Sequence, residues 1–160
     1  MTPRMMAVLG IALISAWMGA ALLASAVVAP AAFAVLPSRT LAGALVGRVL
    51  PVLFWSGMVL GLVAAQVTRA VAAGALGTSA ALSLTAACAA AQLVIGPRIE
   101  AVRESIGGPV DALDPSDPRR QMFGKLHGMS VLFLGIAGIA ALVVLIALVR
   151  SPRFSAPANS

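Results

Sequence analysis

The sequence predicts an all-α membrane protein, an antiparallel bundle of four transmembrane helices. Of the 160 residues, 61% are hydrophobic and 10% are charged, whereas soluble domains are about a quarter charged. The mean hydropathy is +1.04. The apolar residues form continuous runs as long as the roughly 20 residues that a helix needs to cross a bilayer. Because these runs do not alternate polar and apolar residues, they favour helices over the strands of a membrane barrel.

The first apolar run begins after Arg4 and has two interpretations. A secretory signal peptide is one of them, with Ala24-Ser25-Ala26 as the cleavage site. The apolar part of a signal peptide has only about 7–15 residues, and this run continues well past Ala26. We therefore interpret it as a membrane span. The four predicted spans are residues 5–34, 49–68, 70–95 and 128–149, within one domain of residues 1–150.

The connections between the spans are unequal in length. Residues 36–40 predict a tight turn, and spans two and three are joined almost directly, with a turn near Ala73-Gly74. The long loop, residues 97–127, holds all five acidic residues. Within it, Gly107-Gly108-Pro109 is expected to end a short helix, and Asp117-Pro118 to begin the helix that leads into span four. Residues 151–160 predict a disordered tail.

The distribution of Lys and Arg predicts the orientation of the bundle. The loops between spans one and two and between spans three and four together hold seven of the 11 basic residues, and the other side holds four. The positive-inside rule then places the long loop in the cytoplasm and both termini outside.

The net charge of +6 does not indicate nucleic-acid binding. The basic residues lie at the ends of apolar runs, where they anchor helices and meet anionic lipid headgroups. No single basic face with interleaved aromatic residues exists. We therefore expect no nucleic-acid partner. The expected partners are the lipid bilayer, anionic headgroups at the basic side, and a second copy of the chain or another membrane protein.

A candidate ligand-binding site follows from the antiparallel arrangement. Four alternating spans bring the end of span one, the start of span two, the end of span three and the start of span four to one membrane surface. A group of arginines, one histidine and helix ends there can bind an anionic ligand, a lipid headgroup or a cofactor carboxylate. The alternative is that these arginines are only interfacial anchors. The candidate residues are Arg39, Arg48, Arg98, His127 and Ser130.

The sequence offers little for catalysis or metal binding. It has no nucleophile–base pair, no paired carboxylates and no phosphate-binding glycine loop, and its spans contain no acidic residue. His127 is the only histidine and Cys88 the only cysteine, so a closed zinc site is not expected. A haem held by two histidines of one chain is impossible, but a single axial His127 or a site shared across a dimer stays open. We expect no cofactor, no metal and no enzymatic activity.

Several sequence landmarks resemble those of a known family. They are Trp17-x-Gly19, the segment from Pro30 to Arg39, the segment from Ala42 to Pro51, Pro97-Arg98, and Phe123-x-x-Leu126-His127-Gly128-x-Ser130. Together, over roughly residues 7–149, they resemble the transmembrane protein 205-like family. The resemblance implies four spans in an integral membrane protein with no established enzymatic activity. A eukaryotic member is associated with resistance to platinum drugs, which implies the handling of metal complexes or membrane traffic.

Two functional hypotheses follow. The first is a non-enzymatic membrane module that binds or helps to move a small ligand, a lipid or a partner protein. The alternative is a haem- or metal-binding membrane redox protein that uses His127. The family is distantly similar to four-helix copper-resistance and haem-linked membrane proteins, but those rely on histidines that this chain lacks. In both cases the expected location is a bacterial inner membrane.

Overall fold

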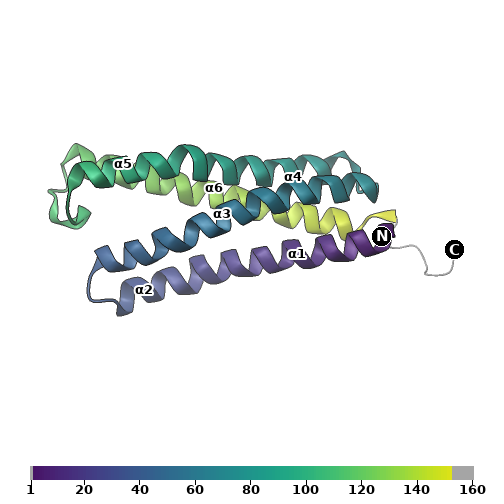
Figure 1. Cartoon of the computed structure of the whole chain (residues 1–160), viewed down its shortest axis with the longest axis horizontal. Coiled ribbons are helices and arrows are strands. Elements are labelled where there is room, and N and C mark those ends of the chain that lie inside the picture. The colour runs from purple at the N-terminus through teal and green to yellow at the C-terminus, as the bar shows by residue number, and fades with distance from the viewer. Residues whose placement is uncertain (1, 153–160) are drawn as a thin grey trace.

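The structure is a computed structural model that describes residues 2–152, and it consists of four long helical segments packed side by side (Figure 1). Each is long and apolar enough to cross a membrane, and they comprise Pro3–Val35, Arg39–Ala70, Gly74–Ile106 and Pro118–Val149. No strand occurs among residues 2–152. The predicted fold class, a helical bundle with four membrane-spanning helices, is confirmed. Most of the predicted disordered tail, residues 153–160, lies outside the described residues.

The four segments divide into shorter elements. The first comprises α1 (Pro3–Leu23), the π-helix η1 (Ala24–Val28) and α2 (Ala29–Val35), and the second is α3 (Arg39–Ala70). The third comprises α4 (Gly74–Ala89), the π-helix η2 (Ala90–Ile95) and α5 (Gly96–Ile106). A short 3-10 helix, η3 (Val110–Ala112), precedes α6 (Pro118–Val149).

Three of these segments continue well past the predicted spans at one end of the bundle. The second begins at Arg39 instead of residue 49, the third ends at Ile106 instead of residue 95, and α6 begins at Pro118 instead of residue 128. Hydropathy marks only the part of a helix that lies in hydrocarbon, whereas backbone hydrogen bonding continues into the polar region. At a rise of 1.5 Å per residue, each extension is roughly 15 Å long.

Local sequence signals explain where the helices begin and end. The hydroxyl of Ser38 accepts a hydrogen bond from the Leu41 N–H at the start of α3, and the Asp117 carboxylate accepts one from the Arg119 N–H at the start of α6. Gly107 ends α5 in the left-handed conformation, with φ of 65°. The turn after α3 uses Ala72 at φ 55° and Gly74 at φ 83°. The turn near Ala73-Gly74 and the helix boundaries at Gly107 and Asp117 agree with the sequence signals.

Each π-helix ends two residues before a proline. Pro30 follows η1 and Pro97 follows η2. Proline has no N–H, and its ring collides with the carbonyl four residues earlier. In both places the chain widens by one residue per turn, so that the Ala29 N–H donates to the Ala24 carbonyl and the Gly96 N–H to the Ala91 carbonyl. The two segments therefore cross the membrane as continuous helices with a local bulge.

The centre of the bundle is closely packed around two glycines of α3. A Cβ on Gly57 would lie 2.6 Å from the Cys88 Sγ and 2.9 Å from the Trp17 ring. The indole N–H of Trp17 donates to the Leu53 carbonyl at 2.9 Å. A Cβ on Gly61 would lie 2.9 Å from the backbone oxygen of Ala81 in α4. The Gly57-x-x-x-Gly61 pair therefore serves packing within the chain.

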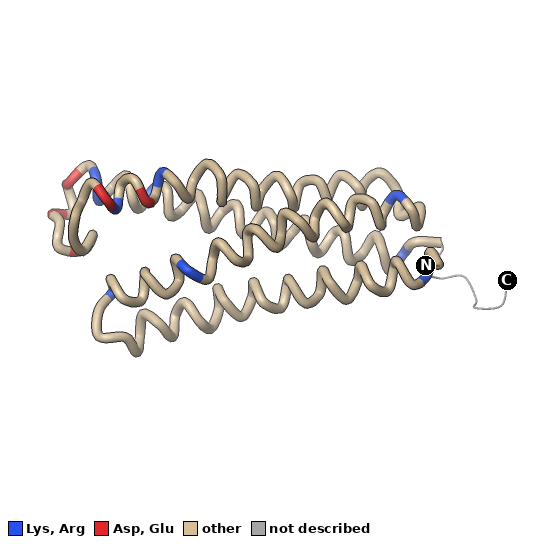
Figure 2. The backbone as a smooth tube through the Cα atoms, in the orientation of Figure 1, with Lys and Arg blue, Asp and Glu red and all other residues tan. Residues whose placement is uncertain are grey.

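One end of the bundle is forked. There, α2 and the first part of α3 diverge from α5 and α6 (Figure 1). We call α2 with residues 39–54 of α3 the apolar arm, and residues 96–130, which include α5 and the start of α6, the polar arm. All the acidic residues lie on the polar arm, as Figure 2 shows. The other end of the bundle carries only basic charges.

Candidate functional site

A cavity of about 710 Å³ lies between the apolar arm and the polar arm. Its volume falls within the range of about 300–1,000 Å³ that is typical of small-molecule sites. Three helical segments far apart in the sequence supply its walls, and each contributes residues spaced three or four apart, so that one face of each helix is turned to the cavity.

The wall from α3 becomes apolar with depth. Arg39 stands at its outer end, Gly43 and Gly47 follow at successive turns, and Leu50 and Phe54 form the deep part. The two glycines present no side chain to the cavity, so in the middle of this wall only Val46 does. A Cβ on Gly43 would meet no atom within 4 Å, so the space beside Gly43 is open.

The wall from η2 and α5 carries more polar side chains than the wall from α3. Gln92 faces the cavity from η2, and Ile99, Glu100 and Arg103 face it from α5. The bulge at η2 changes which side chains are turned inward, because each π-type turn shifts the helical phase by one residue. Within residues 2–152, the side-chain amide of Gln92 has no hydrogen-bond partner, so its donors and acceptor are available to an occupant.

The wall from α6 holds Arg120, Phe123, His127 and Ser130. Their spacing of three, four and three residues places them on one helical face. The Phe123 and His127 rings are parallel, at an interplanar angle of 2° and a centroid distance of 6.3 Å. The Arg103 guanidinium lies 5.7 Å from the Phe123 ring centroid, which is a cation–π contact. Arg103 is thereby held above the cavity.

The charged groups gather at the mouth of the cavity. Arg39 pairs with Asp111 at 3.5 Å, and Arg103 pairs with Glu100 at 3.0 Å. Arg120 belongs to none of the ion pairs of residues 2–152; its Nη1 donates to the Leu113 carbonyl at 2.6 Å. The mouth thus holds three guanidinium groups and two carboxylates, which leaves one formal positive charge when His127 is counted as neutral.

Side chains bridge the two arms at this mouth. The ion pair of Arg39 and Asp111 joins the start of α3 to the loop before α6. Arg103 reaches from α5 toward α3, where its Nη1 would lie 3.7 Å from a Cβ on Gly47. Both partners of the Arg39–Asp111 pair are exposed, and such surface pairs contribute about 0–1 kcal/mol. The arms are therefore held together only weakly here.

The structure brings three of the five predicted site residues to this cavity. Arg39 and His127 line it with exposed side chains, and the buried Ser130 lines its deep end. Arg48 and Arg98 are exposed and are not part of the lining. Both residues lie at the end of the bundle that holds the cavity. Their positions around their helices place them on faces that do not line it.

The five predicted site residues do not include Arg103, Arg120 and Phe123, although the sequence already placed Phe123 at the same membrane surface. The signal for two of them was available, because Arg120 and Phe123 precede His127 by seven and four residues and so share its helical face. Arg103 had no such signal. Its place depends on the packing of α5 against α6, which the spacing within α5 does not reveal.

The described residues offer few metal ligands. Among residues 2–152, no group of three or more His, Cys, Asp or Glu side chains is arranged to hold a metal ion. Cys88 is buried in the bundle, and it lies against Gly57. It is not one of the residues that line the cavity.

Comparison with known proteins places the chain in a family. The model of a family described as a domain of unknown function, DUF4149, matches residues 12–107. The chain belongs to the DUF4149 family. No curated protein and no solved structure matches it.

The DUF4149 match covers only part of the cavity. It includes the α3 wall and the α5 wall, with Arg39, Glu100 and Arg103, and it ends at Gly107. The α6 wall, from Arg120 to Ser130, lies beyond the matched residues. The part of the site that lies within the family match is therefore the pair of facing walls between which Arg103 reaches toward α3.

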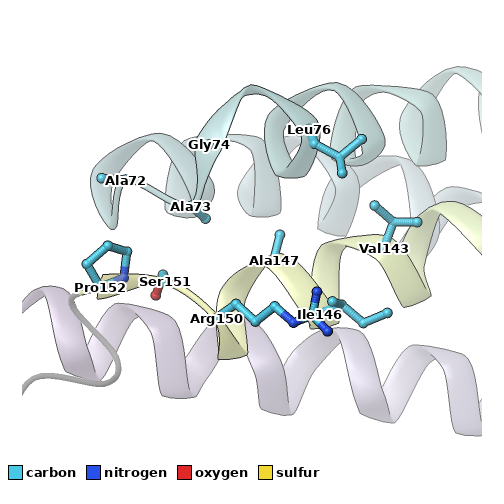
Figure 3. A pocket seen from close by; sticks show the side chains of 10 residues that line it. All are labelled: Ala72, Ala73, Gly74, Leu76, Val143, Ile146, Ala147, Arg150, Ser151 and Pro152. Carbon is cyan, nitrogen blue, oxygen red and sulfur yellow. The ribbon is translucent and has the colours of Figure 1, made fainter.

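A second, smaller cavity of about 430 Å³ lies at the opposite end of the bundle of this DUF4149 protein. Figure 3 shows that mainly apolar side chains of the α3–α4 turn, α4 and α6 surround it, together with Arg150. The Ser151 hydroxyl is already used, because it donates to the Leu148 carbonyl at 2.8 Å. This cavity offers an occupant fewer polar groups than the forked end does.

Proposed function

We propose that this DUF4149 protein is a non-enzymatic membrane module that binds an amphiphilic small molecule in the cavity between its two arms. One observation carries the proposal. The same cavity has three arginines and two carboxylates at its mouth and apolar side chains such as Leu50 and Phe54 at its depth. An amphiphile has the same polarity gradient, and a specific site needs a few placed polar groups on a mainly apolar wall.

The dimensions of the cavity support the same class of ligand. From Arg120 to Ser130 the α6 wall rises roughly 15 Å. The predicted spans begin at Val49 in α3 and at Gly128 in α6, between the two ends of the cavity. The polar mouth therefore stands outside the predicted hydrocarbon region and the apolar depth stands inside it, as the headgroup and chain of an amphiphile do.

The wider setting combines a finding with proposals. Family membership and four apolar helices identify a multi-pass membrane protein of an uncharacterised family. We further propose that the membrane is a bacterial inner membrane and that the family includes the transmembrane protein 205-like proteins. The sequence landmarks at Pro30–Arg39 and Phe123–Ser130 support that proposal.

The haem hypothesis has less support than amphiphile binding. His127 lines the cavity, but it is the only histidine of the chain, and one face of its ring is stacked parallel to Phe123. An absorption spectrum of protein expressed with a haem supply distinguishes the two functions. A Soret band that disappears in His127→Ala would support haem binding, and a colourless preparation would remove it.

Filling the cavity tests the proposed function. Gly43→Leu places a side chain in the open space beside Gly43, and leucine favours a helix more than glycine does. The probe is dansyl-undecanoic acid, an anionic fluorescent amphiphile, added to protein in phosphatidylcholine nanodiscs. Its apparent Kd, from tryptophan-to-dansyl energy transfer, should rise about tenfold in the variant, which corresponds to about 1.4 kcal/mol.

Gly19→Leu is the matched control. Gly19 also lies in a helix with no atom within 4 Å of an added Cβ, and it does not line the cavity. The apparent Kd of this variant should equal that of the wild type. Equal values for all three proteins, with unchanged helical content by circular dichroism, would contradict amphiphile binding between the arms.

A further inference from the structure

The charge at the mouth of the cavity limits what its occupant can be. Two of the three guanidinium groups already have carboxylate partners, Asp111 for Arg39 and Glu100 for Arg103. Arg120 is absent from the ion pairs of the described residues; it interacts electrostatically with the nearby Asp114 carboxylate, which does not line the cavity. The residues that line the mouth therefore carry one more positive than negative charge, which a single anion would balance. A guanidinium binds phosphate oxygens in paired, directed hydrogen bonds.

The depth of the cavity argues against a small soluble anion. Val46, Leu50, Phe54 and Ile99 turn apolar surface toward the space below the arginines. A free phosphate would fill only the mouth and would leave this surface uncovered. An occupant that also carries a hydrocarbon chain would remove the surface from water, at about 25 cal/mol for each Å² buried.

The apolar arm gives such an occupant a route from the bilayer. Its outer part exposes large apolar side chains, with Phe33 at 47%, Val35 at 80% and Leu41 at 53% exposure. Nearly all of this surface lacks charge, as Figure 2 shows, so it suits contact with lipid at the edge of the bilayer. The cavity lies directly beside the arm, because Phe33 of α2 also contributes to its lining.

We propose that the occupant is an anionic glycerophospholipid of the surrounding leaflet, a ligand class that rests on the proposed function above. Its phosphodiester contacts Arg120 and Arg103, its glycerol region lies near the unpartnered Gln92 amide, and the beginning of an acyl chain covers Leu50 and Phe54. The lipid moves in laterally past the apolar arm. The mouth of the cavity therefore recognises a phosphodiester group with a single negative charge.

The test measures which lipids stay bound when the protein leaves a mixed bilayer. Nanodiscs contain equal amounts of phosphatidylglycerol, phosphatidylethanolamine and phosphatidylcholine, and native mass spectrometry counts the lipids retained on the ejected protein. Wild-type protein should retain phosphatidylglycerol about tenfold over phosphatidylcholine. Arg120→Gln and Arg103→Gln should each reduce this ratio at least threefold.

Arg48→Gln is the matched control, because Arg48 is an exposed arginine on the same end of α3 that does not line the cavity. Its ratio should equal that of the wild type. A decrease as large as those of Arg103→Gln and Arg120→Gln would show a general charge effect and overturn the inference. Arg120→Gln also removes the hydrogen bond to the Leu113 carbonyl and can disturb the loop. Arg103→Gln leaves that bond in place and therefore tests the site independently.

The remaining outcomes separate this inference from the proposed function. Equal retention of the three lipids, with dansyl-undecanoic acid binding intact, overturns the phospholipid and leaves the amphiphile site in place. Release of phosphatidylglycerol by millimolar inorganic phosphate assigns the mouth to a soluble anion and also overturns the inference. If Gly43→Leu does not change the binding of dansyl-undecanoic acid, the proposed amphiphile site itself is contradicted, whatever the lipid retention shows.

Discussion

Single residues decide how closely the helices of this bundle approach one another. In a membrane the lipid chains are as apolar as leucine, so helices associate through close packing and hydrogen bonds. Gly57 and Gly61 provide the close packing, the first against Trp17 and Cys88 and the second against α4. Trp17 adds a hydrogen bond to the Leu53 carbonyl. The absence of a side chain at two positions therefore fixes the centre of the fold.

Gly61→Ala should destabilise the protein. The new methyl group would lie 2.9 Å from the Ala81 backbone oxygen, which can move only with the whole of α4. Overpacking of this kind costs about 1–3 kcal/mol, and the better helix propensity of alanine offsets up to about 1 kcal/mol. The net loss should appear in the free energy of unfolding, measured by SDS titration in mixed micelles.

Gly135→Ala is the control at the residue scale, because an added Cβ there meets no atom within 4 Å. This variant should be as stable as the wild type or more so. A Gly61→Ala protein as stable as Gly135→Ala would show that α3 and α4 are packed less closely than described.

At the scale of elements, the ends of the helices project the polar groups of the site. The start of α6 illustrates this. Asp117 accepts hydrogen bonds from the Arg119 backbone N–H and side chain, and these bonds hold the pKa of the Asp117 carboxyl below its usual value. The cap begins α6 ten residues before the predicted span. It thereby makes Arg120 and Phe123 part of a regular helix that faces the cavity.

Asp117→Ala should loosen the first turn of α6, whereas Asp117→Asn should largely preserve it because asparagine is also a good N-cap. Hydrogen exchange of the amides of Arg119 to Gln121 measures the effect. In the wild type the capping contribution is full at neutral pH. It should decline as the pH falls below about 4, the usual Asp pKa, because the lowered folded-state pKa means that protonation weakens the cap. Equal exchange in all three proteins would contradict this role of Asp117.

At the scale of the whole molecule, the charges are distributed unevenly between the two ends. All the acidic residues and seven of the 11 basic residues belong to the forked end and its flanking turns, and Figure 2 shows the acidic ones confined to the polar arm. The cavity lies at this end, so its orientation decides which leaflet and which compartment it faces. The positive-inside rule predicts the cytoplasmic side.

Cysteine labelling tests that orientation. Cys88 is buried, so a membrane-impermeant maleimide should react only with an added cysteine. We expect Ala75→Cys, at the exposed start of α4, to be labelled in intact cells. Ala112→Cys, in the loop of the polar arm, should be labelled only after the membrane is opened. The reverse pattern would place the cavity at the outer face.

The sequence by itself determined the number of helices, their membrane setting and most of their ends. Apolar runs of spanning length indicate that the helices lie in lipid. Signals such as Asp117-Pro118 and Gly107 define helix ends through contacts within a few residues. It also predicted that Arg39, His127 and Ser130 lie at one end of the bundle, where the cavity is found, because alternating spans leave no other arrangement of their ends.

Only the tertiary structure decided which side chains share the cavity. Arg48 and Arg103 both come from the predicted surface, yet only Arg103 lines the site. The difference depends on the rotation of each helix about its axis and on the divergence of α2 and α3 from α5 and α6. Nearly uniform apolar helices carry little information about rotation, since lipid and a neighbouring helix favour the same residues. Close contacts such as those of Gly57 and Gly61 fix the rotation, and those contacts exist only in the folded bundle.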